Sequence, residues 1–285
     1  MSLEKYKKAG KIAIGAKKYA RKIIEPGKPL LGIAEKIENK IRKLGGEVAF
    51  PTNLSINEIA AHYTPGPDTK EKAHGLLKID IGVHVDGYIA DTAFSLDLEN
   101  MEENKKLIRA SEEALSEAIK NSGKEIREIG RAVQNKIESY GFSPIKNLQG
   151  HKLRQYSLHN GTNIPNYDNG NDKKLSPGYY AIEPFSTNGH GKVYEGKPSQ
   201  IYRLIEEKPT RLYRKILKEI KNHRGLPFCS RWLVKKFGKK ARLALKKFEK
   251  DNIIMQYPQL IEENKGKVAQ SEHTVMVNKN TKTLT

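Results

Sequence analysis

The chain has 285 residues, of which 37% are hydrophobic and 30% charged, a balance typical of a globular protein and not of a disordered one. Its length suffices for one large domain with a buried core, with or without an insertion. Cys229 is the only cysteine, which excludes an internal disulfide, and no signal peptide or membrane-spanning stretch is found, so we expect a cytoplasmic protein without membrane contact.

The first predicted elements are two helices. Apolar residues recur at helical spacing from Leu3 to Ile24, where Pro26-Gly27 ends the pattern, and again from Leu31 to Leu44, where Gly45-Gly46 ends it. Strand-like segments follow, separated by turns rich in Pro, Asn and Gly. The chain therefore begins with two helices that precede a β-sheet.

The strongest local signal is a β-hairpin over residues 77–94. Asp86-Gly87 lies between two β-rich runs, and this dipeptide is the preferred two-residue hairpin turn. If these two residues form the loop, Val85 pairs with Tyr88, and the register of the whole hairpin follows from that pair.

Two carboxylates lie on one face of this hairpin. In the predicted register Asp80 pairs with Ala93, so Asp91 is a diagonal neighbour of Asp80, about 7–8 Å away at Cα. The flanking residues are apolar, which favours a buried hairpin over an exposed one. Two buried carboxylates on one face repel each other unless a cation lies between them, so the pattern predicts a divalent metal site.

The arrangement of the first helices recurs 96 residues later. The matching segments are Gly27-Lys28 with Gly123-Lys124, Asn39-Lys40-Ile41 with Asn135-Lys136-Ile137, and Gly45 with Gly141. A series of matches in one register indicates duplication more strongly than any single match. We interpret the chain as two copies of a helix–helix–hairpin unit related by a pseudo-twofold axis, with a site at the seam between them.

A basic segment interrupts the second copy. From Arg203 to Lys250 there are 17 Lys and Arg against 4 Asp and Glu, which supplies +13 of the net charge of +19. We predict helices over 210–223, 230–237 and 240–251, forming a compact helical insertion on the main domain. The positive charge has two interpretations: the segment binds a polyanionic partner, or it is an ordinary helical surface exposed to solvent.

Three later residues are suited to complete a metal site. His151 follows a glycine, and Glu183 and Glu272 each lie in a strand-like apolar segment, where an unpaired acid is costly. Each residue alone is more often structural than a ligand. As a set, four carboxylates balance two divalent cations, and mostly oxygen ligands favour Mn, Fe, Co or Zn over a closed tetrahedral zinc site.

In chain order, these segments resemble those of the methionine aminopeptidases of peptidase family M24, which share the pita-bread fold with prolidase and creatinase. The matching segments are 50–53, 60–65, 78–82, 91–94, Gly150-His151, Ile182-Glu183 and 271–274. The helical insertion, with Phe228-Cys229-Ser230-Arg231-Trp232 inside it, resembles the type II pattern, and the short N-terminus resembles the archaeal form.

The resemblance implies an α+β pita-bread fold with a pseudo-twofold internal repeat. Its catalytic domain covers 1–191 and 258–285, and a helical, winged-helix-like insertion covers 192–257. It implies a metal-dependent aminopeptidase that removes the initiator methionine from nascent proteins when the second residue is small. It also implies a ligand set for two divalent ions (Co, Mn, Fe or Zn), catalytic residues, and a methionine pocket. The implied metal ligands are Asp80, Asp91, His151, Glu183 and Glu272, and the implied catalytic residues are His62, His159 and Glu183. The implied methionine pocket consists of Phe50, Leu158, Ile201, Pro227 and Tyr257, and His62 and His159 are also implied to bind substrate.

Two alternatives stay open. An X-Pro peptidase of the same fold uses the same ligand types, although such relatives usually carry a further N-terminal domain, whereas the first helix here begins near residue 3. A nucleic-acid-binding or ribosome-binding pseudo-enzyme is the other, and the complete ligand set argues against it. For the enzyme we expect a monomer that acts on nascent polypeptide N-termini, with transient contact between the basic insertion and ribosomal RNA.

Overall fold

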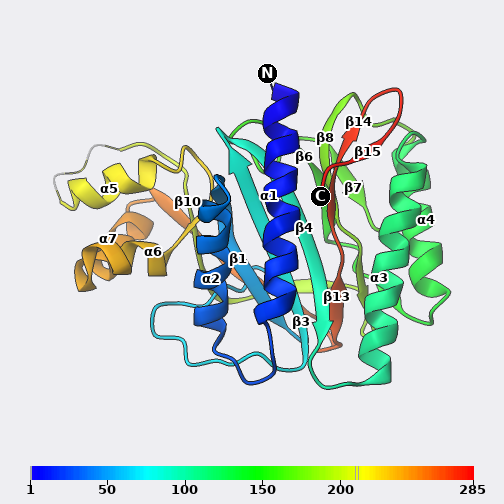
Figure 1. The fold of residues 1–285 in the computed structure, drawn as a ribbon, viewed down its shortest axis with the longest axis horizontal. Coiled ribbons are helices and arrows are strands. Elements are labelled where there is room, and N and C mark those ends of the chain that lie inside the picture. Colours follow the sequence, from blue (N-terminus) through cyan, green and yellow to red (C-terminus); the bar gives the residue numbers. More distant parts are fainter. Residues whose placement is uncertain (1, 209, 211) are drawn as a thin grey trace.

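The computed structural model describes residues 2–208, 210 and 212–285. Two pairs of helices lie on the same side of a curved β-layer, and a smaller group of helices projects from one end of the molecule (Figure 1). None of the helices in the described part of the chain is long and apolar enough to cross a membrane.

The first half places two helices on a three-stranded antiparallel sheet of order β1-β3-β4. Its elements are α1 (Ser2–Ile23), α2 (Leu30–Lys43), β1 (Glu47–Ile56), β2 (Ile59–Ala61), β3 (Leu76–Val85) and β4 (Tyr88–Asp97). Both helices agree with the sequence prediction to within one residue at each end. Small alanines, from Ala9 to Ala20, are fully buried along α1, which lets this helix lie close against the sheet.

The predicted hairpin is confirmed in its register. Val85 lies opposite Tyr88, and Asp80 lies opposite Ala93. Asp86 and Gly87 both have positive φ, +49° and +83°, as the type I′ turn between these strands requires. Asp91 lies opposite Gly82 and is therefore the diagonal neighbour of Asp80 on the same face.

The second half repeats this plan with α3 (Glu102–Asn121), α4 (Ile126–Glu138) and strands β6 (Gln149–Leu153), β8 (Gly178–Ile182) and β14 (His273–Val277) in the places of β1, β3 and β4. Strands β7 (Asn163–Pro165) and β15 (Lys282–Thr283) extend that sheet at its edges, while β5 (Ser143–Pro144), β9 (Phe185–Thr187) and β13 (Val268–Gln270) form a small separate sheet.

The internal repeat appears in how the second helix of each half ends, although the two helices begin differently. Gly45 and Gly141, 96 residues apart, follow α2 and α4 with φ of +82° and +79°, the left-handed conformation that ends many helices. Helix α4 begins at a capping box between Glu125 and Glu128. The predicted duplication is confirmed by this arrangement, with one difference: a two-residue turn joins β3 to β4, whereas the basic segment separates β8 from β14.

The insertion contains strands as well as helices. Its elements are β10 (Val193–Leu204), α5 (Arg214–Lys221), β11 (Phe228–Cys229), α6 (Ser230–Phe237), α7 (Lys239–Lys250) and β12 (Ile254–Glu262). The predicted helix over 210–223 was wrong at both ends. Tyr213 has a left-handed backbone, φ +56°, so the α-helix begins only after it. The other two helices agree with the prediction to within one residue.

The insertion has its own hydrophobic core but is tied to the main body. Phe228, Leu233 and Phe248 are buried in that core. The sheet of order β11-β10-β12-β2 continues from the insertion into the first half through β2. Because β12 extends past residue 257 and pairs with β2 of the first half, the sheet does not divide the chain there. The insertion bounds of 192–257 stay a prediction.

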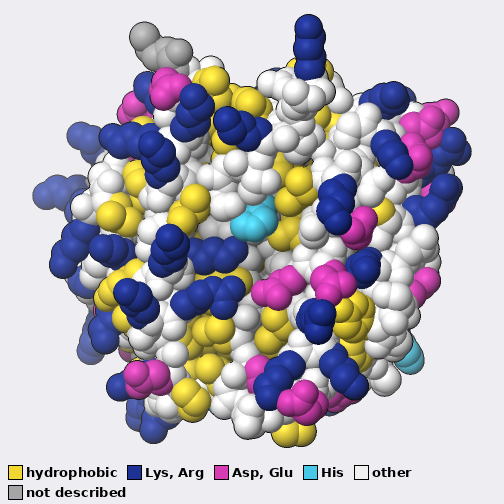
Figure 2. Space-filling model, turned by 45° about the vertical axis from the view of Figure 1, so that its right-hand side comes forward, with side chains coloured by type: hydrophobic (Ala, Val, Ile, Leu, Met, Phe, Trp, Pro, Cys, Tyr) yellow, Lys and Arg dark blue, Asp and Glu magenta, His cyan; other side chains and the backbone are white. Residues whose placement is uncertain are grey.

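Positive charge is not confined to the insertion. On the face drawn in Figure 2, Lys and Arg side chains crowd one side, whereas Asp and Glu side chains lie among them mainly on the other. A few of the lysines on helices form ion pairs with an acid three or four residues away, such as Lys120 with Glu117 at 2.7 Å. Such exposed pairs contribute little to stability, because water and salt screen them.

Candidate metal centre

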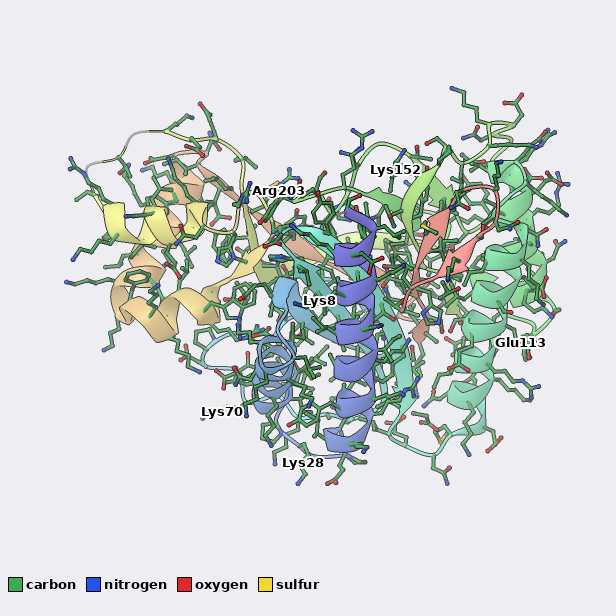
Figure 3. All side chains as sticks on the ribbon, turned by 45° about the horizontal axis from the view of Figure 1, so that its top comes forward. Lys8, Lys28, Lys70, Glu113, Lys152 and Arg203 are labelled. Atoms are coloured by element: carbon green, nitrogen blue, oxygen red, sulfur yellow. The ribbon has the colours of Figure 1, made fainter. Side chains whose placement is uncertain are left out.

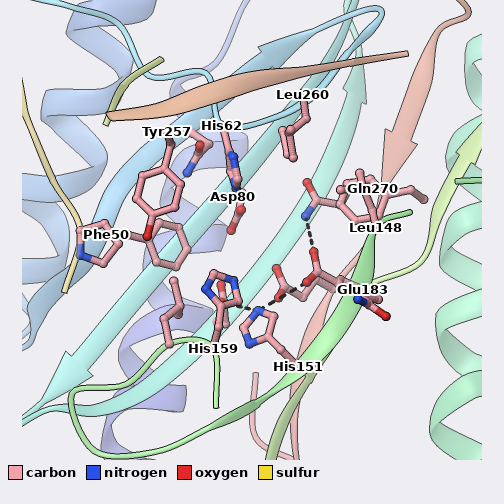
Figure 4. Close-up of a pocket in the computed structure, with 18 of the residues that line it drawn as sticks. Phe50, His62, Asp80, Leu148, His151, His159, Glu183, Tyr257, Leu260 and Gln270 are labelled. Carbon is pink, nitrogen blue, oxygen red and sulfur yellow. Dashed lines mark hydrogen bonds and ion pairs between the residues drawn. The ribbon is translucent and has the colours of Figure 1, made fainter. Parts of the chain in front are cut away.

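A cavity of about 340 Å³ lies over the sheets at the junction of the two halves, and every residue that the sequence predicted for the site lines it (Figure 4). The predicted residues at this cavity are Phe50, His62, Asp80, Asp91, His151, Leu158, His159, Glu183, Ile201, Pro227, Tyr257 and Glu272. They come from both halves and from the insertion, so only the folded chain brings them together.

Hydrogen bonds across the seam between the halves hold two of the acids. The backbone N–H of Asp91 donates to Thr274 Oγ1 at 2.7 Å, and the hydroxyl of Thr274 donates back to the Asp91 carbonyl at 2.9 Å. The N–H of Glu272 donates to the carbonyl of Ala93 at 3.1 Å. Strand β4 of the first half and the segment that leads into β14 are thereby fixed side by side, with a carboxylate on each.

Glu183 and Glu272 do not lie inside strands, and the sequence interpretation was wrong on this point. Glu183 lies between β8 and β9, and Glu272 lies between β13 and β14. Pro184 follows Glu183 and has no N–H to continue the ladder, which explains the first break. At the second break the chain leaves its own sheet and bonds to β4. Each break turns a carboxylate toward the cavity.

The candidate ligand atoms are close together and buried. Asp91, His151 and Glu272 each offer an atom within 4.8 Å of the other two, and their exposures are 3%, 5% and 1%. His151 Nε2 lies 3.9 Å from Asp91 Oδ2 and 3.4 Å from Glu183 Oε1. The spacing leaves room for a cation among them.

Several oxygens of this cluster have no hydrogen-bond partner among the described residues. They are Oδ1 of Asp80, Oδ1 of Asp91 and Oε2 of Glu272. A buried carboxylate oxygen without a hydrogen-bond partner lowers the stability of the fold by about 1–3 kcal/mol, and by more when the group is charged. Divalent cations would satisfy these oxygens, and hard oxygen donors with one imidazole suit Mn, Fe, Co or Zn. The residues present therefore fit a metal pair.

Burial sets the protonation of this cluster in the absence of a cation. It raises the pKa of Asp80 to about 7. It also raises the pKa of Asp91, Glu183 and Glu272, and the neighbouring carboxylates raise these further by repulsion. Burial lowers the pKa of His151, so the imidazole is neutral and its lone pair is available to a metal.

Gln270 is a site residue that the sequence interpretation missed. Its Nε2 donates to Glu183 Oε2 over 3.5 Å, a contact drawn in Figure 4. The side chain lies two positions before Glu272, and residues two apart in extended chain share a face. This two-residue spacing from Glu272 is the sequence feature that could have indicated Gln270 as a site residue. It places the amide of Gln270 beside the carboxylates.

Two further histidines line the cavity near the carboxylates. The ring of His159 lies 4.4 Å from that of His151, and the ring of His62 lies 5.4 Å from that of Tyr257. Burial lowers the pKa of His62 to about 4 and also lowers that of His159, so both rings are neutral at pH 7. His62 has φ +64°, a costly backbone for a side chain other than glycine that is typical of functional sites.

One end of the cavity is apolar. Phe50 lies on β1 opposite Gly82, where a Cβ would overlap its ring, and Leu158 precedes His159. The insertion supplies the rest of this wall through Ile201 on β10, Tyr257 on β12 and Pro227. Leu148 and Leu260, which the sequence interpretation did not assign, lie on the other side of Asp80 from Phe50 (Figure 4).

Comparisons with known proteins point to one family of peptidases. The model of metallopeptidase family M24 matches residues 4–279. The chain is 46% identical to a methionine aminopeptidase of Methanocaldococcus jannaschii over 291 residues, which covers 98% of each chain. It is also 46% identical to a methionine aminopeptidase of Pyrococcus abyssi over 295 residues, which covers 100% of this chain and 99% of the other.

A similar solved structure supports the fold. The crystal structure of a methionine aminopeptidase from Thermotoga maritima superimposes with a TM-score of 0.71 at 25% sequence identity, covering 99% of this chain and 96% of that one. The pita-bread architecture expected from the sequence is thereby confirmed.

Proposed function

The chain belongs to metallopeptidase family M24, and we propose that it is a methionine aminopeptidase that removes the initiator methionine from new proteins when the second residue is small. The observation that carries this proposal is the convergence of four carboxylates and one imidazole on a cavity with an apolar end. The metal site would supply the chemistry, and the apolar end would select the side chain.

The five converging side chains would hold two divalent ions, Co, Mn, Fe or Zn. Asp91 and Glu272, which face each other across the seam, would bridge both ions. Asp80 would hold one ion, and His151 with Glu183 would hold the other. Four negative charges balance two divalent cations, which is the charge argument for a pair. Such a pair polarises a carbonyl and lowers the pKa of a water molecule toward neutrality.

The surrounding residues would manage protons and charge. Glu183 would accept a proton from the nucleophilic water and pass it to the leaving amine, with Gln270 orienting its carboxylate. His159, neutral at pH 7, would donate a hydrogen bond to the oxyanion that develops on the substrate carbonyl. His62 would hydrogen-bond the substrate backbone near the leaving group.

Substrate selection would follow from the two ends of the cavity. A methionine side chain would pack against Phe50, Ile201 and Tyr257, which suit a flexible apolar chain. The second residue would lie on the side of Leu148 and Leu260, whose side chains would limit its size.

Metal-dependent release of methionine tests the proposal. Protein freed of metal by a chelator is given Mn, Fe or Co and assayed on Met-Ala-Ser, beside an Asp91→Ala control. We expect free methionine only when metal is added and only from the unaltered protein. No release with any metal, from protein shown to be folded, would refute the proposal.

The same assay addresses the X-Pro alternative. Cleavage of a Met-Pro dipeptide in preference to Met-Ala-Ser would identify an X-Pro peptidase using the same five ligands. Cleavage of Met-Ala-Ser alone would support the methionine aminopeptidase.

We further propose that the enzyme is a cytoplasmic monomer whose insertion contacts ribosomal RNA while it acts on nascent chains. Exposed cations without an ion-pair partner among the described residues support this contact: Arg214, Lys215, Lys218, Lys239, Lys240, Lys246 and Lys250. Phosphate contacts weaken steeply with salt. Co-sedimentation with ribosomes should therefore be lost as salt is raised, and binding unchanged in high salt would contradict the proposal.

A further inference from the structure

A second depression adjoins the catalytic cavity, and we infer that it binds the part of the substrate beyond its first two residues and favours acidic side chains there. This inference rests on the proposed aminopeptidase function. It adds a specificity for the later residues of the nascent chain, which the metal site itself does not contact.

The depression, here called the basic groove, has a volume of about 600 Å³. Four cations line it, Lys152, Arg154, Lys173 and Lys174, and no acidic side chain is among its lining residues. Its other lining residues are mainly amides, hydroxyls and glycine. A groove of this composition attracts an anionic segment of chain.

The basic groove is continuous with the catalytic cavity. Gln149 and Asn163 line both depressions. Asn163 lies opposite His151 in the pairing of β7 with β6, so this shared wall is in register with a candidate metal ligand. A polypeptide whose first residue occupies the cavity reaches the basic groove by passing over these two side chains.

The cations of the basic groove lack acidic partners within the described residues. Lys152 Nζ donates only to a neutral group, Ser176 Oγ at 2.8 Å, and Lys173 and Lys174 are exposed. Of the acids near the groove, Glu125 pairs with Arg127 at 2.7 Å and Asp168 pairs with Arg131 at 2.6 Å, which leaves Asp172, an exposed neighbour of Lys173 outside the lining, against four cations. The groove therefore keeps a net positive potential, which an acidic segment would complement.

The geometry of an extended chain sets which substrate positions are involved. Each extended residue advances about 3.3–3.6 Å, so residues from about the third to the sixth can lie over the groove. Figure 3 places Lys152 over the second half of the molecule, away from the insertion that carries Arg203. The basic groove is thus a different surface from the one proposed for ribosomal RNA.

Such contacts should change KM and leave kcat unaltered, because they are the same in the ground state and the transition state. An exposed ion pair changes an equilibrium constant by about 1.5- to 5-fold. With two or three such contacts, Met-Ala-Ser-Asp-Asp-Asp should have a kcat/KM about tenfold above that of Met-Ala-Ser-Lys-Lys-Lys in low salt. In 1 M salt, where the screening length falls to about 3 Å, the two values should converge.

A charge-reversed groove tests the assignment. The double variant Lys173→Glu with Lys174→Glu should lose or reverse the preference for the acidic peptide, and the ratio between the two peptides is the readout, so any general loss of activity cancels. The matched control is Lys70→Glu, an exposed lysine on the loop before β3 and outside the groove, which should keep the preference of the unaltered protein.

Two outcomes would overturn the inference. Equal kcat/KM for the acidic and basic peptides in low salt is one. The other is a double variant that keeps the full preference for the acidic peptide. If the two peptides are cleaved equally and polyphosphate inhibits the unaltered protein but not the double variant, the groove is a nucleic-acid site instead. Cleavage of Met-Ala-Ser, which is too short to reach the cations, tests the metal site separately, so failure there is distinct from failure of the groove.

Discussion

A buried ion pair joins the insertion to the first half, and removing one partner should destabilise the protein. Glu38 of α2 and Arg231 of α6 form this pair, and their side chains are only 2% and 3% exposed. The Glu38 carboxylate also accepts hydrogen bonds from Trp232 Nε1 at 2.8 Å and from the N–H of Thr52 at 3.2 Å. The substitution Glu38→Gln keeps the shape and removes the charge.

The cost follows from the burial of Arg231. A buried charge that loses its partner destabilises a protein by about 3–5 kcal/mol. Arg231 retains hydrogen bonds from Nη1 to Thr64 Oγ1 at 2.7 Å and to the Pro65 carbonyl at 3.0 Å. Because these partners remain, we expect a loss near the lower limit, about 3 kcal/mol.

A second ion pair between the same two helices is the matched control. Glu35 and Lys235 lie 3.2 Å apart, but their side chains are 40% and 72% exposed. An exposed pair of this kind contributes less than about 1 kcal/mol, so Glu35→Gln should change little. The comparison isolates burial, because the helices joined and the chemical substitution are the same.

Urea denaturation of both variants, followed by circular dichroism and by the fluorescence of Trp232, measures the effect. A double variant, Glu38→Leu with Arg231→Met, should recover part of the stability, because no unpaired charge stays buried. Equal losses for Glu38→Gln and Glu35→Gln, or a loss below about 1 kcal/mol for the buried pair, would refute the reasoning.

Three further predictions concern the site and the insertion. His159→Ala should lower kcat by about 10²-fold or more, as loss of an oxyanion donor does, with the metal content retained; a parallel fall in bound metal, measured by elemental analysis, would show that His159 is a ligand instead. Chelation should lower the melting temperature of the unaltered protein, because four buried carboxylates lose their counter-charge, and should have little effect on Asp91→Ala; an equal decrease in both would argue against this site. Burial lowers the pKa of His223 to about 4, below its usual value near 6.5, so the stability it contributes is complete above about pH 6.5 and is lost as the pH falls through about 4. The ring of His223 stacks on Trp232, the only tryptophan, at 5.5 Å, so Trp232 fluorescence should change on acidification in the unaltered protein and not in His223→Phe; the same change in both would contradict the assignment.

Short-range features of the protein could be predicted from the sequence. The spacing of apolar residues predicted α1, α2, α6 and α7 to within one residue, because an amphipathic helix depends on neighbours three and four positions apart. The Asp86-Gly87 turn predicted the hairpin register and, through it, the shared face of Asp80 and Asp91. The register of matching segments 96 residues apart predicted the duplication.

Other features depend on contacts between distant parts of the chain. The break that turns Glu272 toward the cavity arises from a hydrogen bond to β4, and the left-handed backbone of Tyr213 delays the start of α5, where the sequence pattern predicts a helix from residue 210. Strands β10 and β12 lie on either side of the predicted helices in an insertion that the sequence interpretation described as helical. They form through long-range pairing, of β10 with β12 and of β12 with β2.

The same distinction holds for the site. Residue types and a resemblance suggested the ligands, but their convergence requires the seam where β4 meets the start of β14. Gln270 and the basic groove went unnoticed because neither has a local pattern that separates it from ordinary polar surface. Helical periodicity and turn residues act over a few positions, so they can be recognised along the chain. Burial and proximity depend on long-range packing. The shifted pKa values of the site and the pairing of Glu38 with Arg231, 193 residues away, therefore exist only in the folded protein.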